Sequence, residues 1–224
     1  MVKEEIEEYI NSHASEEKAN FDRGLIETRF EIKGLKMKDI DDFAKRLVKM
    51  DINFKELPLD NHEEIVLAGC YIGHSKFSAK EKISLLKQLL PYIDNWASCD
   101  CVVSRLKNVE SEREFFASLL KSDEPFYNRV GIVWLMRYQL KNDLKNVVEL
   151  ISQVKSDHFY VKMAKAWAYA EAFIYDFEFM YEFTKKIDDS FIKNKTIQKA
   201  CESFRISSQN KEELKELRVK RGNR

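Results

Sequence analysis

The amino-acid sequence predicts an all-α fold, and three observations lead to that prediction. Apolar residues recur at intervals of three and four along almost the whole chain of 224 residues, which is the spacing of one helix face. No long stretch alternates between apolar and polar residues, as a half-buried strand would. The chain has only six Gly and three Pro, too few for the turns of a β-sandwich or barrel, whereas helix-favouring Lys, Glu, Leu and Ala are plentiful.

The periodicity predicts thirteen helices separated by short turns, and several of their ends carry helix signals. Ser78 and the pair Ser156-Asp157 stand where a side chain caps a helix start, and Pro125 stands at a first helical position. Pro91 follows LLKQLL and marks a helix end. The helices are expected at residues 2–12, 16–29, 37–50, 61–74, 78–90, 92–107, 111–121, 124–140, 143–154, 158–174, 176–186, 189–205 and 210–219.

Helices of this length cannot each bury a full apolar face alone, but antiparallel pairs stacked on one another can. The sequence therefore predicts a single domain over residues 1–224, built as an α-solenoid of about six helical pairs. A compact helical bundle is the alternative, because the repeats are degenerate in sequence. The 44% hydrophobic content is sufficient for either core.

Composition also limits cofactors and compartment. The four cysteines show no metal-ligand spacing, so we expect reduced core thiols and neither a metal nor an organic cofactor. The start MVKEEIEEYI lacks a basic region followed by an apolar run, and no stretch reaches the roughly 18 apolar residues of a membrane span. We therefore expect a cytoplasmic protein with no membrane partner, and a monomer. The cysteines are Cys70, Cys99, Cys101 and Cys201.

The formal net charge is zero, which alone argues against a nucleic-acid binder, but the charges are unevenly placed. Residues 193–224 hold ten Lys or Arg against four Glu, whereas the first seventeen residues hold six Glu and one Lys. A basic surface is thus compatible with the neutral total. Lys199 and Arg205 lie in this basic segment, as DNA-backbone contacts or on an ordinary solvated helix face.

The segment YIDNWASCDCVVSRLK places Trp96 and Asp100 four residues apart, so the indole and the carboxylate share one helix face. Asp100 interrupts a run that is otherwise uncharged from Trp96 to Ser104. It is either a structural carboxylate, paired or hydrogen-bonded, or a catalytic carboxylate beside an aromatic wall. The core side of this helix is expected to be the apolar stripe Cys99, Val102, Val103 and Leu106.

Two later helices carry further candidates. Arg129 begins RVGIVWLMRYQ, where we expect unpaired helical N–H groups, and it suits either a phosphate or an interhelical salt bridge. Trp167 stands among small alanines, so its ring lies either in the core or along a groove, open to a base or a cation. Lys162 and Lys165 flank its stripe, and Phe159 is expected in the core.

Four segments in order resemble the AlkD-type family of DNA alkylation repair proteins, which are built from HEAT-like repeats. They are NWASCD with its W-x-x-x-D, RVGIVWLMRYQ, FYVKMAKAW and KTIQKACESFRIS. The resemblance runs from about Glu16 to Leu217, and Gly34 matches a glycine hinge in the family's opening segment. Two positions depart from the family: Leu25 replaces an aromatic residue of some members, and Glu27 replaces the proline of a common LIPT motif.

The resemblance implies a HEAT-like repeat fold whose concave face binds double-stranded DNA with alkylated bases. Position by position, it implies Asp100 as the catalytic aspartate, Trp96 and Trp167 as aromatic walls at the lesion, and Arg129 beside the lesion-bearing backbone. The activity implied is a DNA glycosylase that excises cationic N3- or N7-alkylated purines. We expect the cations Lys162, Lys165, Lys199 and Arg205 to hold DNA phosphates.

Two other functions remain open at the level of sequence. One is a catalytically silent DNA-binding repeat protein that recognises bent or branched DNA with the same groove. The other is a protein-binding helical scaffold, for which the zero net charge is the best argument.

Overall fold

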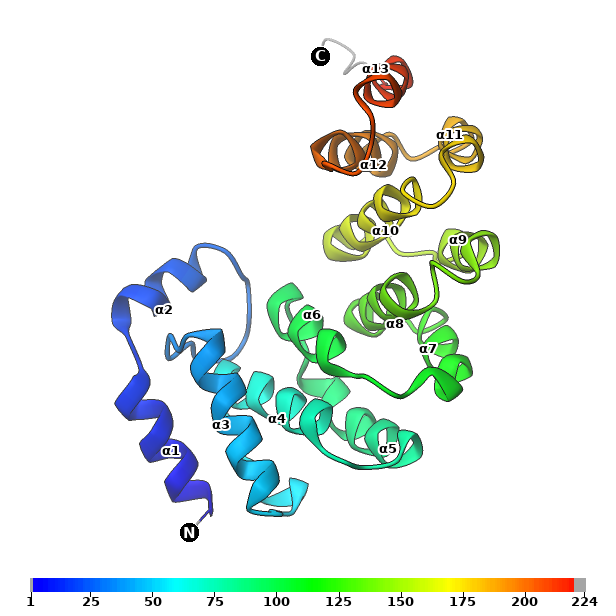
Figure 1. Cartoon of the computed structure of the whole chain (residues 1–224). Coiled ribbons are helices and arrows are strands. Elements are labelled where there is room, and N and C mark those ends of the chain that lie inside the picture. The colour runs from blue at the N-terminus through cyan, green and yellow to red at the C-terminus, as the bar shows by residue number, and fades with distance from the viewer. Residues whose placement is uncertain (1, 220–224) are drawn as a thin grey trace. The chain divides into compact units, whose positions relative to one another are not determined.

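The computed structural model describes residues 2–219, and these residues form helices joined by short turns (Figure 1). No β-strand occurs in this range, where the one bridge of β type joins Glu31 to Asn61. The predicted all-α class is therefore confirmed. The α-helices are α1 (Val2–His13), α2 (Glu16–Arg23), α3 (Met37–Lys49), α4 (His62–His74), α5 (Ala79–Leu89), α6 (Trp96–Arg105), α7 (Arg113–Leu119), α8 (Pro125–Tyr138), α9 (Leu144–Ser152), α10 (Phe159–Ala172), α11 (Phe177–Lys185), α12 (Ser190–Glu202) and α13 (Ser208–Glu216), and short 3-10 turns occupy Phe54–Glu56, Leu90–Tyr92 and Glu110–Glu112.

Each predicted helix has a counterpart, and the largest error is at the second one. The sequence predicted a helix over 16–29, but α2 ends at Arg23 and its C-cap is Gly24. The backbone beyond Gly24 bonds to distant side chains instead of continuing the helix. The N–H of Arg29 donates to Asp94 (2.8 Å), and that of Lys33 donates to Glu63 (2.9 Å). Tertiary partners thus override the local helical pattern.

The helix signals were correct at three positions and wrong at a fourth. Pro91 follows α5, which ends at Leu89, as predicted. Ser78 forms a reciprocal capping box with Glu81, and Pro125 is the first residue of α8. The pair Ser156-Asp157 does not cap α10, whose N-cap is His158 without a side-chain bond. The Asp157 carboxylate pairs with Lys162 instead, at 2.8 Å.

The chain divides into two compact units, an N-terminal unit of Met1–Arg113 and a C-terminal unit of Glu114–Arg224, each described here by itself. In the N-terminal unit α4 is the central helix and packs against α3, α5 and α6. Eleven of its residues form an unbroken buried run from His62 to Ile72. Gly69 permits the close approach of α6, because a Cβ there would lie 2.1 Å from a methyl group of Val102.

In the C-terminal unit α10 lies between α8 and α12, and Figure 1 shows these three helices in one row with α9 and α11 in a second. The first row is close-packed through small residues of α10, among them Ala164, Ala166 and Ala168. A fully buried Trp134 stacks on Phe116 with ring centroids 3.9 Å apart. Within this unit the helices alternate as stacked pairs.

Burial bears out only part of the expectation for the thiols. All four cysteines are free; Cys70 and Cys99 are buried, whereas Cys101 and Cys201 are half-buried. Burial raises the pKa of the Cys70 thiol to about 12, so this thiol is neutral and unreactive at physiological pH. Within residues 2–219, no helix is both long enough and apolar enough to cross a membrane.

Candidate functional site

Helix α6 presents the two candidate residues of the N-terminal unit. It begins at Trp96, directly after Asn95, whose side chain accepts a hydrogen bond from the N–H of Ser98. The predicted apolar stripe is confirmed, since Cys99, Val102, Val103 and Leu106 are all fully buried. Trp96 and Asp100, one turn apart, are both half-buried and therefore reach the surface of the unit.

The indole of Trp96 is held by the segment that follows α2. Its Nε1 donates a hydrogen bond to the carbonyl oxygen of Leu25 (3.1 Å). The ring also packs against a buried cluster of Ala19, Ile26 and Ile32. A side chain with a fixed hydrogen bond and a fixed packing face has few rotamers left, so the ring position is set before any ligand binds.

The start of α6 is tied to the same segment. The Thr28 hydroxyl donates to the Asp94 carboxylate (2.8 Å), and the N–H of Arg29 donates to the same group (2.8 Å). The fully buried Asn95 places its Nδ2 3.0 Å from Asp94 and 3.4 Å from Nδ1 of His62. Burial lowers the pKa of His62, which favours its neutral form. Residues far apart in the sequence thus orient the first turn of α6.

Gly34 lies in the connection between α2 and α3, where the resemblance implies a glycine hinge. Its φ of +83° is strained for any side chain, and a Cβ there would lie 2.3 Å from the carbonyl oxygen of Ser15. The buried carboxylate of Glu63 accepts hydrogen bonds from the N–H groups of Lys33 (2.9 Å) and Gly34 (2.7 Å). Glu63 therefore fixes the connection between α2 and α3 against α4.

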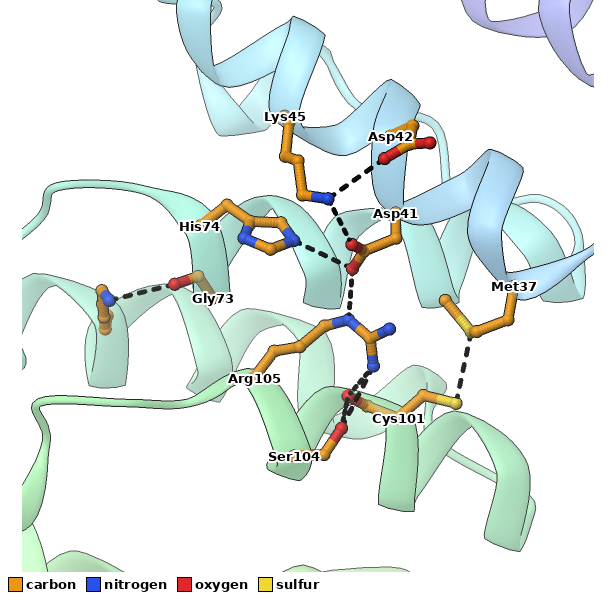
Figure 2. A network of polar contacts seen from close by, with 10 residues as sticks. Met37, Asp41, Asp42, Lys45, Gly73, His74, Cys101, Ser104 and Arg105 are labelled. Atoms are coloured by element: carbon orange, nitrogen blue, oxygen red, sulfur yellow. Dashed lines mark hydrogen bonds and ion pairs between the residues drawn. The ribbon is translucent and has the colours of Figure 1, made fainter.

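The last turn of α6 is held by the polar network drawn in Figure 2. Arg105 of α6 donates through Nε to Asp41 of α3 (2.6 Å), which also contacts His74 Nε2 (2.9 Å) and Lys45 Nζ (2.8 Å). Partial burial alone would raise the pKa of the Asp41 carboxyl. The hydrogen bonds from Lys45, Arg105 and His74 outweigh it and hold that pKa far below its usual range. Both ends of α6 are thus anchored by long-range contacts.

The C-terminal unit brings three of the predicted site residues together. Trp167 of α10, Lys199 of α12 and Arg205 line one open cavity of about 420 Å³. Trp167 is half-buried while Ala166 and Ala168 beside it are fully buried, so its ring lies along a groove rather than in the core. The groove alternative for Trp167 is therefore the correct one.

A family model described as DNA alkylation repair enzyme matches residues 4–204 of the chain. The chain belongs to this family. The match covers α6 of the N-terminal unit and α8, α10 and α12 of the C-terminal unit, so every candidate residue except Arg205 lies within it. No curated protein matches the chain.

Membership in the DNA alkylation repair family implies a DNA substrate. The cations of the C-terminal unit differ in their burial and in their hydrogen-bond partners. Lys162 pairs with Asp157 (2.8 Å) and Asp189 (3.0 Å), and Arg205 pairs with Glu171 (2.8 Å). Each pair has a partly or fully exposed member, so solvent screens it and it holds its cation only weakly.

Arg129 and Lys165 are more deeply placed in this repair enzyme. Arg129 is only 5% exposed and donates through Nη1 to the carbonyl oxygen of Tyr160 (2.8 Å). It is the fifth residue of α8, so the expectation that it lies among the unpaired N–H groups of the first turn is wrong. The ammonium of Lys165, 8% exposed, donates to the carbonyl oxygens of Val154 (2.9 Å) and Ser152 (3.3 Å). Lys165 therefore provides hydrogen bonds to the carbonyl oxygens at the C-terminal end of α9.

The sequence did not reveal several residues that shape these candidate sites, and it predicted the wrong environment for one residue. Asp94 carried the signal of a polar pair, Asp94-Asn95, directly before a helix, whereas Asp41 carried none because its partner Arg105 lies 64 residues away. Phe159 was expected in the core but is 54% exposed at the start of α10. Within residues 2–219, no three His, Cys, Asp or Glu side chains are grouped so that they would hold a metal ion.

Proposed function

We propose that the chain is a DNA glycosylase that removes cationic N3- or N7-alkylated purines from DNA. The observation that carries the proposal is the anchored helix α6 of a DNA alkylation repair enzyme, on which Trp96 and Asp100 reach the surface one turn apart. The stacked HEAT-like pairs with a concave DNA-binding face belong to the same proposal.

Asp100 acts on the sugar rather than on the base. An alkylated purine of this kind already carries a positive charge, so the base leaves as a neutral molecule with the electron pair of the broken C–N bond and needs no general acid. Positive charge develops on the deoxyribose as the bond breaks. The Asp100 carboxylate stabilises that charge and orients the water that attacks the sugar carbon, and the water's second proton is released. The products are the free base and an abasic site.

The aromatic rings make the reaction selective for charged lesions. An indole face attracts a cation with roughly 0.5–2 kcal/mol, an energy that an undamaged neutral base does not receive. Trp96 is suited to this because its hydrogen bond to Leu25 fixes its orientation. The resemblance gives Trp167 the same task, and Trp167 is half-buried beside an open cavity.

We assign the phosphate contacts to Lys162, Lys199 and Arg205. Arg129 and Lys165 are left out because both are buried and donate to backbone carbonyl oxygens of their own unit. Each phosphate contact adds to the salt dependence of binding, because binding releases condensed counterions. DNA affinity should therefore fall steeply as the salt concentration rises. A flat salt dependence would instead support a protein-binding scaffold.

The decisive experiment measures the release of methylated bases from DNA treated with a methylating agent. We expect wild type to release N3-methyladenine or N7-methylguanine, and Asp100→Asn to lose at least about 100-fold in rate while its DNA affinity stays equal or rises. The matched control is Asp42→Asn, which neutralises an exposed carboxylate of α3 in the same unit and should leave the rate unchanged. Release by Asp100→Asn at the wild-type rate would contradict the assignment.

A second function is favoured by two observations near Trp96. Leu25, where some members carry an aromatic residue, is 49% exposed, and Glu27 places an exposed negative charge two residues further on. Leu25 offers no ring face to a cationic base. The Glu27 carboxylate repels the DNA phosphates and so weakens DNA binding beside Trp96. A catalytically silent DNA binder fits them. Folded wild type that binds bent or branched DNA but releases no base from methylated DNA would establish this second function.

A further inference from the structure

The loop after α12 displays an aromatic ring that nothing in the proposed reaction uses. Phe204 is 102% exposed, the most exposed of the large apolar side chains between residues 2 and 219. The loop is nevertheless held on both sides of the ring. The N–H of Ser203 bonds to the carbonyl of Ala200 (3.2 Å), the N–H of Arg205 bonds to the Ser203 hydroxyl (3.2 Å), and Ile206 is buried. A fully exposed phenyl ring on a fixed loop is suited to contact a ligand.

Phe204 lines the same open cavity of about 420 Å³ as Trp167. Small Ala170 also lines the cavity, and the charged lining residues are Lys199, Arg205, Glu171 and Glu202. The two cations and two carboxylates cancel in formal charge. What distinguishes the cavity is its two aromatic surfaces, which favour the flat face of a nucleobase.

The two carboxylates of the cavity are also suited to bind a nucleobase. Nucleobases carry exocyclic amino groups that donate to carboxylate oxygens, and Glu171 and Glu202 both line the cavity. Glu171 accepts one hydrogen bond from Nη2 of Arg205 (2.8 Å), which directs the guanidinium toward the cavity wall. The phosphates that flank a bound base are suited to Lys199 and Arg205 at the same cavity.

We propose that Phe204, together with Trp167, forms a stacking site for one unpaired nucleobase of the bound DNA. The site lies entirely within the C-terminal unit, and Phe204 is its specificity-determining residue, because its ring selects an unstacked base over a paired one. The inference rests on the proposed function in one respect only, namely that the ligand is DNA.

The experiment measures the affinity of Asp100→Asn protein for three labelled DNAs by fluorescence anisotropy. The DNAs are a fully paired duplex, the same duplex with one bulged adenine, and the same duplex with a bulged tetrahydrofuran sugar that lacks a base. We expect the bulged adenine to bind at least about 5-fold more tightly than the bulged sugar, since stacking on an aromatic ring contributes at least that much. Adding Phe204→Ala should abolish this difference, and Phe204→Tyr should retain it.

Two controls separate stacking from other effects. Tyr175→Ala removes another exposed ring of the C-terminal unit that does not line the cavity, and should leave the preference unchanged. Phe204→Leu should lose the preference; if leucine retains it, the residue acts as an apolar wedge and the stacking site is wrong. Equal affinity of the starting protein for the bulged adenine and the bulged sugar also overturns the inference. Base release from methylated DNA by wild type would show in that case that the proposed function still stands.

Discussion

The N-terminal and C-terminal units hold their candidate residues by different kinds of contact. In the N-terminal unit, Trp96 bonds to a backbone carbonyl, and α6 is anchored at both ends by Asp94 and Arg105. In the C-terminal unit, Lys162 and Arg205 are held mainly by carboxylates at partly exposed positions. The first arrangement fixes side-chain geometry, as a reaction centre requires, and the second leaves cations that exchange one anionic partner for another, as a DNA-binding surface requires.

This comparison leads to different expectations for substitutions in the two units. Changes to the anchors of α6 should alter the rate of base release, because they move Trp96 and Asp100. Changes to the ion-paired cations should alter DNA affinity and its salt dependence, with little effect on folding. Three substitutions test these expectations, each paired with a close control.

The largest expected effect is that of Gly34→Ala in the N-terminal unit. Gly34 has a φ of +83°, and an added Cβ would lie 2.3 Å from the Ser15 carbonyl oxygen and 2.4 Å from the Ala19 nitrogen. Backbone atoms cannot yield as a flexible side chain would, so we expect a loss of more than about 3 kcal/mol in the free energy of unfolding. Urea unfolding followed by circular dichroism measures the loss.

Gly24→Ala is the matched control for this substitution. Gly24 has a φ of −76°, and its Cβ would lie 3.3 Å from the nearest atom, the carbonyl oxygen of Phe21. Alanine is compatible with that backbone conformation, so a change within about 1 kcal/mol is expected. Equal urea midpoints for the two variants would show that the Gly34 hinge does not constrain the fold.

An intermediate effect is expected for Lys165→Met in the C-terminal unit. This substitution removes the ammonium that donates to the carbonyl oxygens of Val154 and Ser152. Leaving two buried acceptors unsatisfied should cost about 1–3 kcal/mol in the free energy of unfolding. Because Lys165 is buried, the salt dependence of DNA binding should not change.

Lys162→Met should show the opposite pattern. Lys162 pairs with the exposed Asp157 and with Asp189, so its loss should cost no more than about 1 kcal/mol of stability. The slope of log affinity against log salt should become shallower by about 1, as expected for one lost phosphate contact. If Lys165→Met reduced the slope and Lys162→Met did not, the division between structural and DNA-binding lysines would be reversed.

Local sequence patterns were sufficient to predict the helices and to predict which residues share one face of a helix. The spacing of Cys99, Val102 and Val103 correctly predicted the buried side of α6, and hence that Trp96 and Asp100 are on another side. For Trp167, the small alanines beside it left a core position and a groove position open, and the structure decided between them.

Long-range contacts account for what the sequence did not reveal. Nothing in the periodicity around Leu25 indicates that the chain leaves the helix to bond to Asp94, about 65 residues away. The burial of Lys165 could not be inferred either, because it depends on where the end of α9 lies in space rather than on the neighbours of Lys165. Phe204 was missed for a related reason, since its exposure results from a loop held by Ser203 and Ile206.

The smallest of the three effects concerns the Asp41 network and depends on pH. Hydrogen bonds from Lys45, Arg105 and His74 lower the pKa of Asp41 in the folded chain below the ordinary value of about 3.9 for an unfolded one. The ionised group therefore stabilises the fold fully above about pH 4, and this contribution is lost as the pH falls further. Asp41→Asn should lower the free energy of unfolding at pH 7 by about 1 kcal/mol. It should also make the decline in stability below about pH 4 correspondingly shallower.

Asp42→Asn, at the neighbouring and more exposed position, is the control and should leave both the stability and its pH dependence as in wild type. The same pair tests whether the network positions α6. Asp41→Asn should slow base release while leaving the salt dependence of DNA binding unchanged, since Asp41 anchors Arg105 of α6 within the N-terminal unit. If its pH profile of stability matched that of Asp42→Asn, the Asp41 carboxylate would contribute nothing to the anchoring of α6, and the contrast between the two units would rest on Trp96 and Asp94 alone.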